Sequence, residues 1–82
     1  MMLVAVKLFA RAKDLAGADM VSVEVPEQAT VGDLRRQLAL MYPALKTLLE
    51  RSALAVHDEF AGDATVLLAN AEVALLPPVS GG

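Results

Sequence analysis

The sequence predicts a single α+β domain: a mixed sheet whose first and last strands are parallel and central, with one main helix packed on one face. Three observations lead to this prediction. The chain has only 82 residues, it begins and nearly ends with apolar strand-like segments, and one segment between them has helical periodicity. A chain of this length has room for one hydrophobic core. With 56% apolar residues, it is too hydrophobic to be intrinsically disordered.

Composition excludes several classes of function. The chain has no Cys and a single histidine, His57, which excludes a disulfide framework, a thiolate nucleophile and a multi-histidine metal site. The formal net charge is −3, with only seven Lys and Arg, so nucleic-acid binding is not expected. No apolar run reaches the roughly 20 residues of a membrane-spanning helix. The first residues are interpreted as a strand rather than a signal peptide, so we expect a cytoplasmic protein without a membrane partner.

The first part of the chain predicts two strands. Residues 2–9 are apolar at nearly every position, which is typical of a strand covered on both faces. Residues 11–19 include Gly17 and are interpreted as an irregular connection. Residues 20–25 then alternate between apolar and polar positions until Pro26 ends the strand.

One amphipathic helix follows. Thr30 is suited to cap the free backbone N–H groups at the helix start, and Asp33 lies in the first turn, where the helix dipole favours an anion. The helix stops before Pro43, because the residue before a proline is pushed out of the α region. Pro43 is well placed to open a second, shorter helical turn. The apolar stripe of the main helix consists of Val31, Leu34, Leu38 and Met41.

The last part predicts two more strands. Residues 54–57 form a short strand, and a polar turn at Asp58-Glu59 follows. Residues 62–71 fit either a strand or one helical turn. Residues 72–76 alternate again, and the two prolines that come next end the ladder hydrogen bonding.

This order of elements predicts the β-grasp, or ubiquitin-like, arrangement over residues 1–76. The helix provides the right-handed crossover that a parallel first and last strand require. Residues 77–82 are expected to form a flexible, functional tail that ends in Gly-Gly. The predicted core consists of Val4, Val6, Leu8, Val21, Val23, Val25, Leu34, Leu38, Val73 and Leu75.

The side chains offer little catalytic chemistry. His57 and Asp58 are neighbours at a strand end, so we expect their side chains to point to opposite faces. Glu59 and Asp63 are interpreted as solvated turn residues rather than part of a paired-carboxylate site. From Ser52 onward the chain has acidic residues and no Lys or Arg. This pattern fits either a basic partner surface or a solvated acidic face.

The C-terminus is the most distinctive feature. A random chain ends in two glycines only about 0.5% of the time. Since glycine has no Cβ, Gly81 and Gly82 would pass through a channel that any side chain would block. The reactive group would then be the α-carboxylate of Gly82. The alternative is an inert end.

A partner surface is expected on the open face of the sheet. Neighbouring residues of a strand face opposite ways, so the residues next to the core positions point away from the helix. Monomers rarely expose a large apolar patch unless it is a binding site. The residues expected in one such patch are Phe9, Leu76, Leu3, Phe60 and Val79.

The terminal hexapeptide Pro77-Pro78-Val79-Ser80-Gly81-Gly82 resembles the terminal signature of the molybdopterin synthase small subunit, the MoaD family. The runs VKLFARAKDLAG, from Val6, and TVGDLR, from Thr30, are similar to the same family. Two departures lie outside the tail. The run Ala69-Asn70-Ala71 stands where the family often has Asp-Gly-Asp, and His57 stands where it usually has Asn.

The resemblance implies a sulfur carrier that binds no cofactor and forms a heterotetramer with the large subunit of molybdopterin synthase. An E1-like activating enzyme would use ATP and Mg to adenylate Gly82, and a sulfur donor enzyme would convert the adenylate to a thiocarboxylate. The tail, held through Pro77, Pro78, Val79 and Ser80, would donate sulfur to a cyclic pyranopterin phosphate precursor in molybdenum cofactor biosynthesis. Catalytic side chains of this sulfurtransferase complex would then belong to the partners.

Other users of such a tail remain open. One is a sulfur carrier of the thiazole pathway of thiamine synthesis, and another is a ubiquitin-like protein modifier joined to lysines. A third is a β-grasp adaptor whose tail is inert. The lead-in Pro77-Pro78-Val79 favours molybdopterin synthase.

Overall fold

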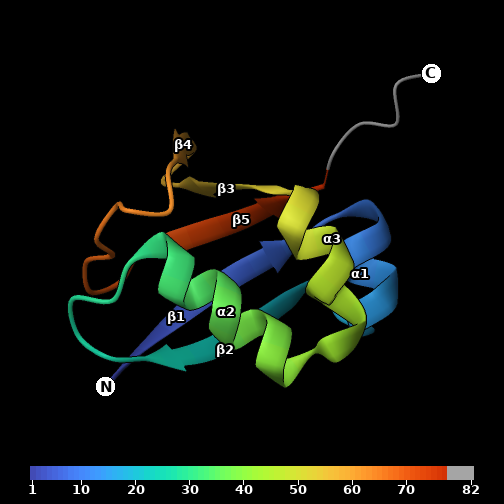
Figure 1. The fold of residues 1–82 in the computed structure, drawn as a ribbon, viewed down its shortest axis with the longest axis horizontal. Helices are drawn as coiled ribbons and strands as arrows, with labels where there is room; N and C mark the ends of the chain where they lie inside the picture. The colour runs from blue at the N-terminus through green and yellow to red at the C-terminus, as the bar shows by residue number, and fades with distance from the viewer. Residues whose placement is uncertain (78–82) are drawn as a thin grey trace.

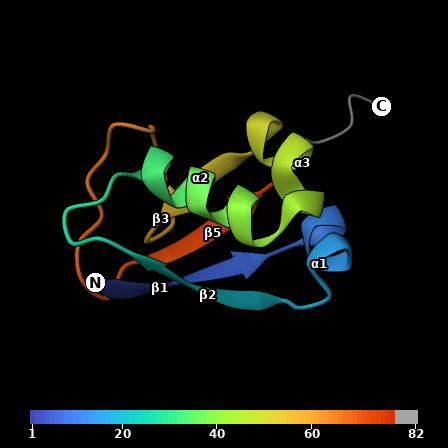
Figure 2. The ribbon, with the colours of Figure 1, turned by 60° about the horizontal axis from the view of Figure 1, so that its bottom comes forward.

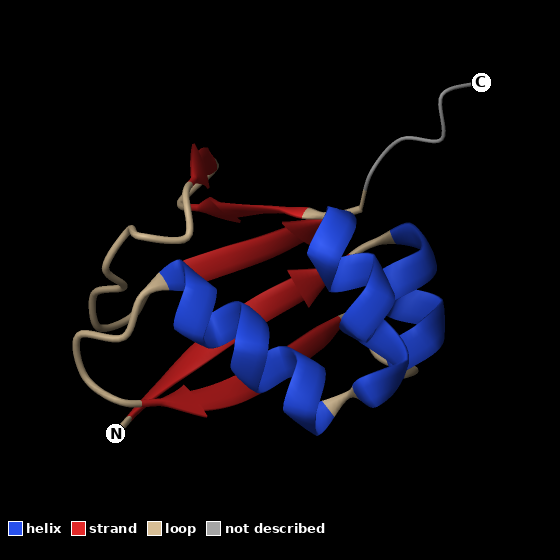
Figure 3. Ribbon diagram, in the orientation of Figure 1, coloured by secondary structure: helices blue, strands red, loops and turns tan. Residues whose placement is uncertain are grey.

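The computed structural model describes residues 1–77, which form one five-stranded sheet with helices on one side (Figures 1 and 3). The strands are β1 (Met2–Leu8), β2 (Met20–Val25), β3 (Ala53–Val56), β4 (Glu59–Ala61) and β5 (Glu72–Leu76). The helices are α1 (Ala10–Ala16), α2 (Val31–Met41), the 3₁₀ helix η1 (Pro43–Leu45) and α3 (Lys46–Arg51). Figure 2 shows α2 lying across one face of the sheet, with α1 and α3 at the end where β1 terminates.

The strand order is β2-β1-β5-β3-β4. β1 pairs with β2 antiparallel and with β5 parallel, while β3 pairs antiparallel with both β5 and β4. The first and last strands are therefore parallel neighbours at the sheet centre, and the predicted β-grasp fold is confirmed.

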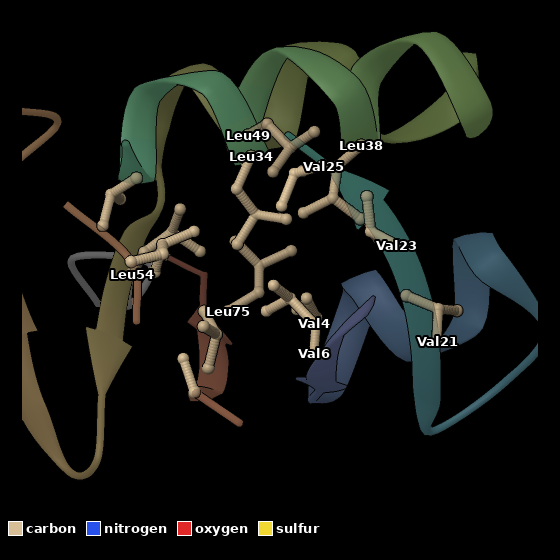
Figure 4. Close-up of a cluster of buried hydrophobic side chains, with 14 of the residues drawn as sticks. Val4, Val6, Val21, Val23, Val25, Leu34, Leu38, Leu49, Leu54 and Leu75 are labelled. Atoms are coloured by element: carbon tan, nitrogen blue, oxygen red, sulfur yellow. The ribbon is translucent and has the colours of Figure 1, made fainter. Parts of the chain in front are cut away.

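The core lies between the sheet and the helices. All ten predicted core residues are buried, and none is more than 7% exposed. Figure 4 shows Val4, Val6 and Leu75 of the central strands facing side chains of the helices, among them Leu34 and Leu38. Further large side chains complete the core: Leu45, Leu49, Leu54 and Leu67.

The start of α2 agrees with the sequence. The backbone N–H of Asp33 donates to Thr30 Oγ1 at 3.2 Å, and Asp33 Oδ2 accepts from the backbone N–H of Thr30 at 2.9 Å. This reciprocal capping box satisfies two N–H groups that the helix itself leaves free. The backbone N–H and then the hydroxyl of Thr30, with Arg36 nearby, hold the pKa of Asp33 below its ordinary value.

The apolar stripe of α2 is shorter than predicted. Met41, its last expected member, is exposed, so the buried stripe ends at Leu38. The chain turns after Met41 into η1 and α3, and their residues Leu45 and Leu49 fill the core next to Leu38 instead.

The prediction of an irregular connection over residues 11–19 was wrong, because α1 occupies most of it. Ala12 is fully buried on its inner side. Gly17 has a φ of 72°, and its N–H donates to the carbonyl of Lys13. The glycine therefore ends a helix in the left-handed conformation, which costs glycine little.

The region between the late strands also differs from the prediction. The expected strand 54–57 is Ala53–Val56, and both His57 and Asp58 have positive φ, as a two-residue hairpin turn requires. Glu59 belongs to β4 rather than to the turn. Residues 62–71 form neither a helix nor a strand, apart from one bridge between Val66 and Thr30.

This loop is bonded to the start of α2. The N–H groups of Val31 and Gly32 donate to the carbonyls of Thr65 and Asp63 at 2.8 and 2.9 Å. The carboxylate of Asp63 also lies 3.2 Å from the Arg35 guanidinium. A Cβ on Gly32 would lie 3.2 Å from both Cβ and O of Asp63, so glycine permits this close approach.

Replacing Leu38 by Ala is expected to destabilise the domain by about 2–5 kcal/mol, because the fully buried side chain would leave a cavity. Chemical denaturation measures the loss. Leu40→Ala on the exposed side of α2 is the control and should change stability by less than about 0.5 kcal/mol. Equal effects of the two substitutions would contradict the packing described here.

The capping box predicts a pH dependence of stability. Because folding lowers the pKa of Asp33 below 3.8, its contribution is present above that value and is lost as the pH falls through the lowered pKa. The melting temperature of the wild type should exceed that of Asp33→Asn at neutral pH. The difference should shrink as the solution is acidified below pH 4, and a constant difference would exclude this role of the charge.

Candidate functional site

The base of the tail is fixed by the central strand. β5 is hydrogen-bonded to β1 on one side and to β3 on the other, and its side chains Val73 and Leu75 are buried. The strand ends at Leu76, at the same end of the sheet as α1 and α3 (Figure 1). Pro77 follows and is partly buried. The predicted tail residues Pro78, Val79, Ser80, Gly81 and Gly82 lie outside the described residues.

The face of the sheet opposite the helices is open. Its central row, read across the register from β2 to β4, consists of Met20, Lys7, Ala74, Ala55 and Phe60. Phe60 is exposed, whereas Ala55 is buried beneath its neighbours. The row is apolar from the centre of the sheet to the β4 edge, with Lys7 the one charged side chain in it.

Phe9 and Leu76 extend this row toward the end of the sheet where the tail begins. The register pairs Leu8 with Leu75, and both are buried against the helices. Phe9 keeps an extended backbone, with φ of −130° and ψ of 154°, so its side chain and that of Leu76 turn to the open face. We call the set Phe9, Ala53, Ala55, Phe60, Ala74 and Leu76 the apolar patch.

Leu3 is exposed on the same face but lies apart from the apolar patch. It pairs with Glu24, toward the other end of β1 and four residues before Lys7. At about 3.3 Å per residue, it lies some 13 Å from that row. Ala5 lies between them and has Ser22 and Glu72 as its neighbours. Leu3 is therefore separate from Phe9, Leu76 and Phe60. The prediction that all four belong to one contiguous patch was wrong for Leu3.

The small apolar residues of the patch were missed by the sequence analysis. Ala53, Ala55 and Ala74 carry no conspicuous signal individually. Alternation around the buried Leu54 and Leu75 was the pattern that would have placed them on the open face. Their size matters, because three alanines leave a shallow floor between the larger side chains of Phe60 and Leu76.

Titratable side chains do not converge on a catalytic arrangement in the part of the chain that the structure describes. His57 and Asp58 are exposed in the β3–β4 turn, and the backbone N–H of His57 donates to the carbonyl of Glu72. Within residues 1–77, no cluster of three or more His, Asp or Glu side chains is arranged to hold a metal ion. No helix in that range is long and apolar enough to cross a bilayer.

Comparisons with known proteins agree with this geometry. The model of the ThiS family matches residues 6–82. The molybdopterin synthase sulfur carrier subunit of Dictyostelium discoideum is 38% identical over 78 residues, which cover 92% of this chain and 91% of that protein.

Two solved structures share the fold. The crystal structure of small archaeal modifier protein 1 from Haloferax volcanii has a TM-score of 0.87 at 32% identity, over 96% of this chain and 100% of that one. A chain in the complex of subunits 1 and 2 of molybdopterin-converting factor from Helicobacter pylori has a TM-score of 0.70 at 27% identity, over 99% of this chain and 100% of that one. Each match thus spans the whole length of the solved chain.

Proposed function

This chain belongs to the ThiS family, and on that premise we propose that it is the sulfur carrier subunit of a molybdopterin synthase. The observation that carries the proposal is the position of the terminal hexapeptide, which continues directly from the central strand of the sheet. Residues 1–76 then serve as the domain that partners recognise, and residues 77–82 serve as the reactive tail.

The chemistry follows from the terminal carboxylate. A carboxylate is a poor acyl donor, so an E1-like activating enzyme, using ATP and Mg, adenylates Gly82: a carboxylate oxygen attacks the α-phosphorus and pyrophosphate leaves. Sulfide-level sulfur from a donor enzyme then attacks the acyl carbon, AMP leaves, and a thiocarboxylate is formed. That group supplies sulfur to a cyclic pyranopterin phosphate precursor, and two such deliveries complete the dithiolene of molybdopterin. The carrier contributes its terminus to this chemistry and binds no cofactor of its own.

The large subunit of molybdopterin synthase is the proposed partner, and the small and large subunits together form a heterotetramer in the cytoplasm. The Helicobacter pylori complex of subunits 1 and 2 supports this pairing. The apolar patch docks on the large subunit, and the tail enters it. Five residues beyond Pro77 reach up to about 18 Å when extended, which suffices to cross a narrow channel. Pro77, Pro78, Val79 and Ser80 line the contact with that channel.

A second function is supported by the likeness to small archaeal modifier protein 1. In that case the activated Gly82 forms an amide bond with lysines of other proteins. The two functions make different products from the same adenylate. A discrete complex with one large subunit supports molybdopterin synthase, and a ladder of covalent conjugates supports a modifier.

The apolar patch predicts the affinity for the large subunit. Replacing Phe9 or Leu76 by Ala should weaken binding by about 1–3 kcal/mol, because each removes an apolar side chain from the contact. Isothermal titration with the purified large subunit measures this loss. Leu3→Ala is the matched control, since Leu3 is exposed on the same face but lies apart from the patch. Unchanged affinity for both patch variants would remove the proposed interface.

The terminal diglycine predicts a loss of activity without a loss of stability. Deleting Gly82 moves the carboxylate back by up to about 3.5 Å. Since a misplacement of 1 Å already costs about 100-fold in rate, sulfur transfer should be nearly abolished. Gly81→Ala keeps the carboxylate in register, but its Cβ obstructs a narrow channel, so transfer falls while adenylation persists.

The measurements are thiocarboxylate formation by intact mass, transfer to the precursor, and melting curves for wild type and both variants. Unchanged melting temperatures with lost transfer are expected, because the described core is built from side chains between Val4 and Leu75 and glycine has no side chain to add to it. Full activity of the protein lacking Gly82 would mean that the tail is inert.

A further inference from the structure

A concave surface lies at the β4 edge of the sheet, between the β3–β4 hairpin and the loop of residues 62–71. It is a hollow of about 420 Å³ with a mainly apolar lining. We call it the edge hollow. Its lining includes Val56, Ala61, Thr65, Val66, Leu68 and Ala71.

The edge hollow shares Phe60 with the apolar patch, but it lies on the helix side of the sheet edge. Ala61 pairs with the buried Leu54 and so faces the helix side of the sheet, whereas Phe60 pairs with Ala55 and faces the open side. Along β5, Ala71 at one end of the hollow lies about 20 Å from Pro77, whereas Ala61 lies level with Leu75, two strands away from it.

One wall of the hollow is held in place before any partner binds. The N–H groups of Val31 and Gly32 bond the carbonyls of Thr65 and Asp63, and the N–H of Leu67 donates to the carbonyl of Ala29 at 2.8 Å. The side chain of Leu67 is buried in the core. The loop therefore presents Val66 and Leu68 from a fixed backbone, which lowers the entropy lost on binding.

Two features of the rim favour a peptide-like occupant. Val66 is 50% exposed and Leu68 is 74% exposed, so two large apolar side chains are available for contact. β4 is hydrogen-bonded to β3 on one side, and within residues 1–77 no strand pairs with its other side. A free strand edge offers backbone donors and acceptors to an added strand.

The charges specify the occupant further. Glu59 lines the hollow beside His57, and within residues 1–77 Glu59 has no cation within ion-pair distance. Asp63 is paired with Arg35, so it contributes less. The sequence from Ser52 to its end contains no Lys or Arg. A basic occupant therefore gains attraction at this rim and meets no like charge from this part of the chain.

We propose that the edge hollow and the free edge of β4 bind an extended segment of a partner protein in which an apolar residue and a Lys or Arg stand two positions apart. The segment adds a strand to β4, so side chains two positions apart point to the same face. The apolar side chain enters the hollow beside Leu68, and the basic side chain faces Glu59. Because the described lining of the hollow lies within residues 56–71, before β5 and Pro77, this partner is held while the tail remains available to others. The site does not depend on the chemistry of the tail.

The test is selection from a phage-displayed library of random octapeptides on the full-length protein, followed by affinity measurement with the enriched peptides. Enriched sequences should carry an apolar residue and a Lys or Arg two positions apart, and their binding should shift the backbone amide resonances of β4 and Leu68. Leu68→Glu and Glu59→Lys should each weaken binding by about tenfold or more. Leu40→Glu is the matched control, since Leu40 on α2 is 75% exposed against 74% for Leu68, and it should bind like wild type.

Melting curves of all three variants should match the wild type, because the substituted side chains are exposed. The proposal is overturned if no peptide is enriched or if the enriched peptides lack Lys and Arg. It is equally overturned if the shifts map to the open face, or if Leu68→Glu binds as tightly as Leu40→Glu.

Discussion

The parallel ladder between β1 and β5 is the contact on which the rest of the structure depends. It joins residues that are far apart in sequence, such as Ala5 and Glu72, so the whole intervening chain must be ordered before it forms. Its buried side, with Val6 and Leu75, provides the surface on which α2 packs. The same ladder determines where the chain leaves the sheet after Leu76. The proposed reactive terminus thereby starts from a strand that is paired on both sides.

The two faces of the sheet around this ladder also have different roles. On the helix side the central strands are filled with branched side chains, and the stability of the domain comes from that side. On the open side β5 carries only Ala74 between Glu72 and Leu76, and β3 adds two alanines. Small side chains leave the sheet surface accessible to a partner, while Phe60 and Leu76 provide the larger contacts. In the proposed function, recognition thus needs few side chains, and the chemistry is left to the terminal carboxylate.

The sequence was most informative where its periodicity was long. The strands β1 and β2, the helix α2 and the ten core positions could all be predicted, because alternation or helical spacing extends over many residues there. The short elements were not predicted. Gly17 resembled a loop signal although it ends a helix, and the left-handed turn at His57 lacks the glycine that marks such turns. The loop at Thr65 is shaped by bonds to the start of α2, which no local pattern encodes. For the site, alternation placed Leu76 on the open face, but only the register separates Leu3 from it.

The distribution of charge between the helix layer and the sheet layer agrees with the proposed contacts. Six of the seven Lys and Arg residues lie on α1, α2 and α3, whereas seven of the ten acidic residues lie on strands and loops. The sheet layer is therefore the negative one, and long-range attraction orients this layer toward a basic partner surface. Both the apolar patch and the edge hollow belong to it. Apolar contact supplies affinity, and charge supplies orientation. Because the cationic helices repel a basic partner, the opposite side of the domain does not compete for the same partners.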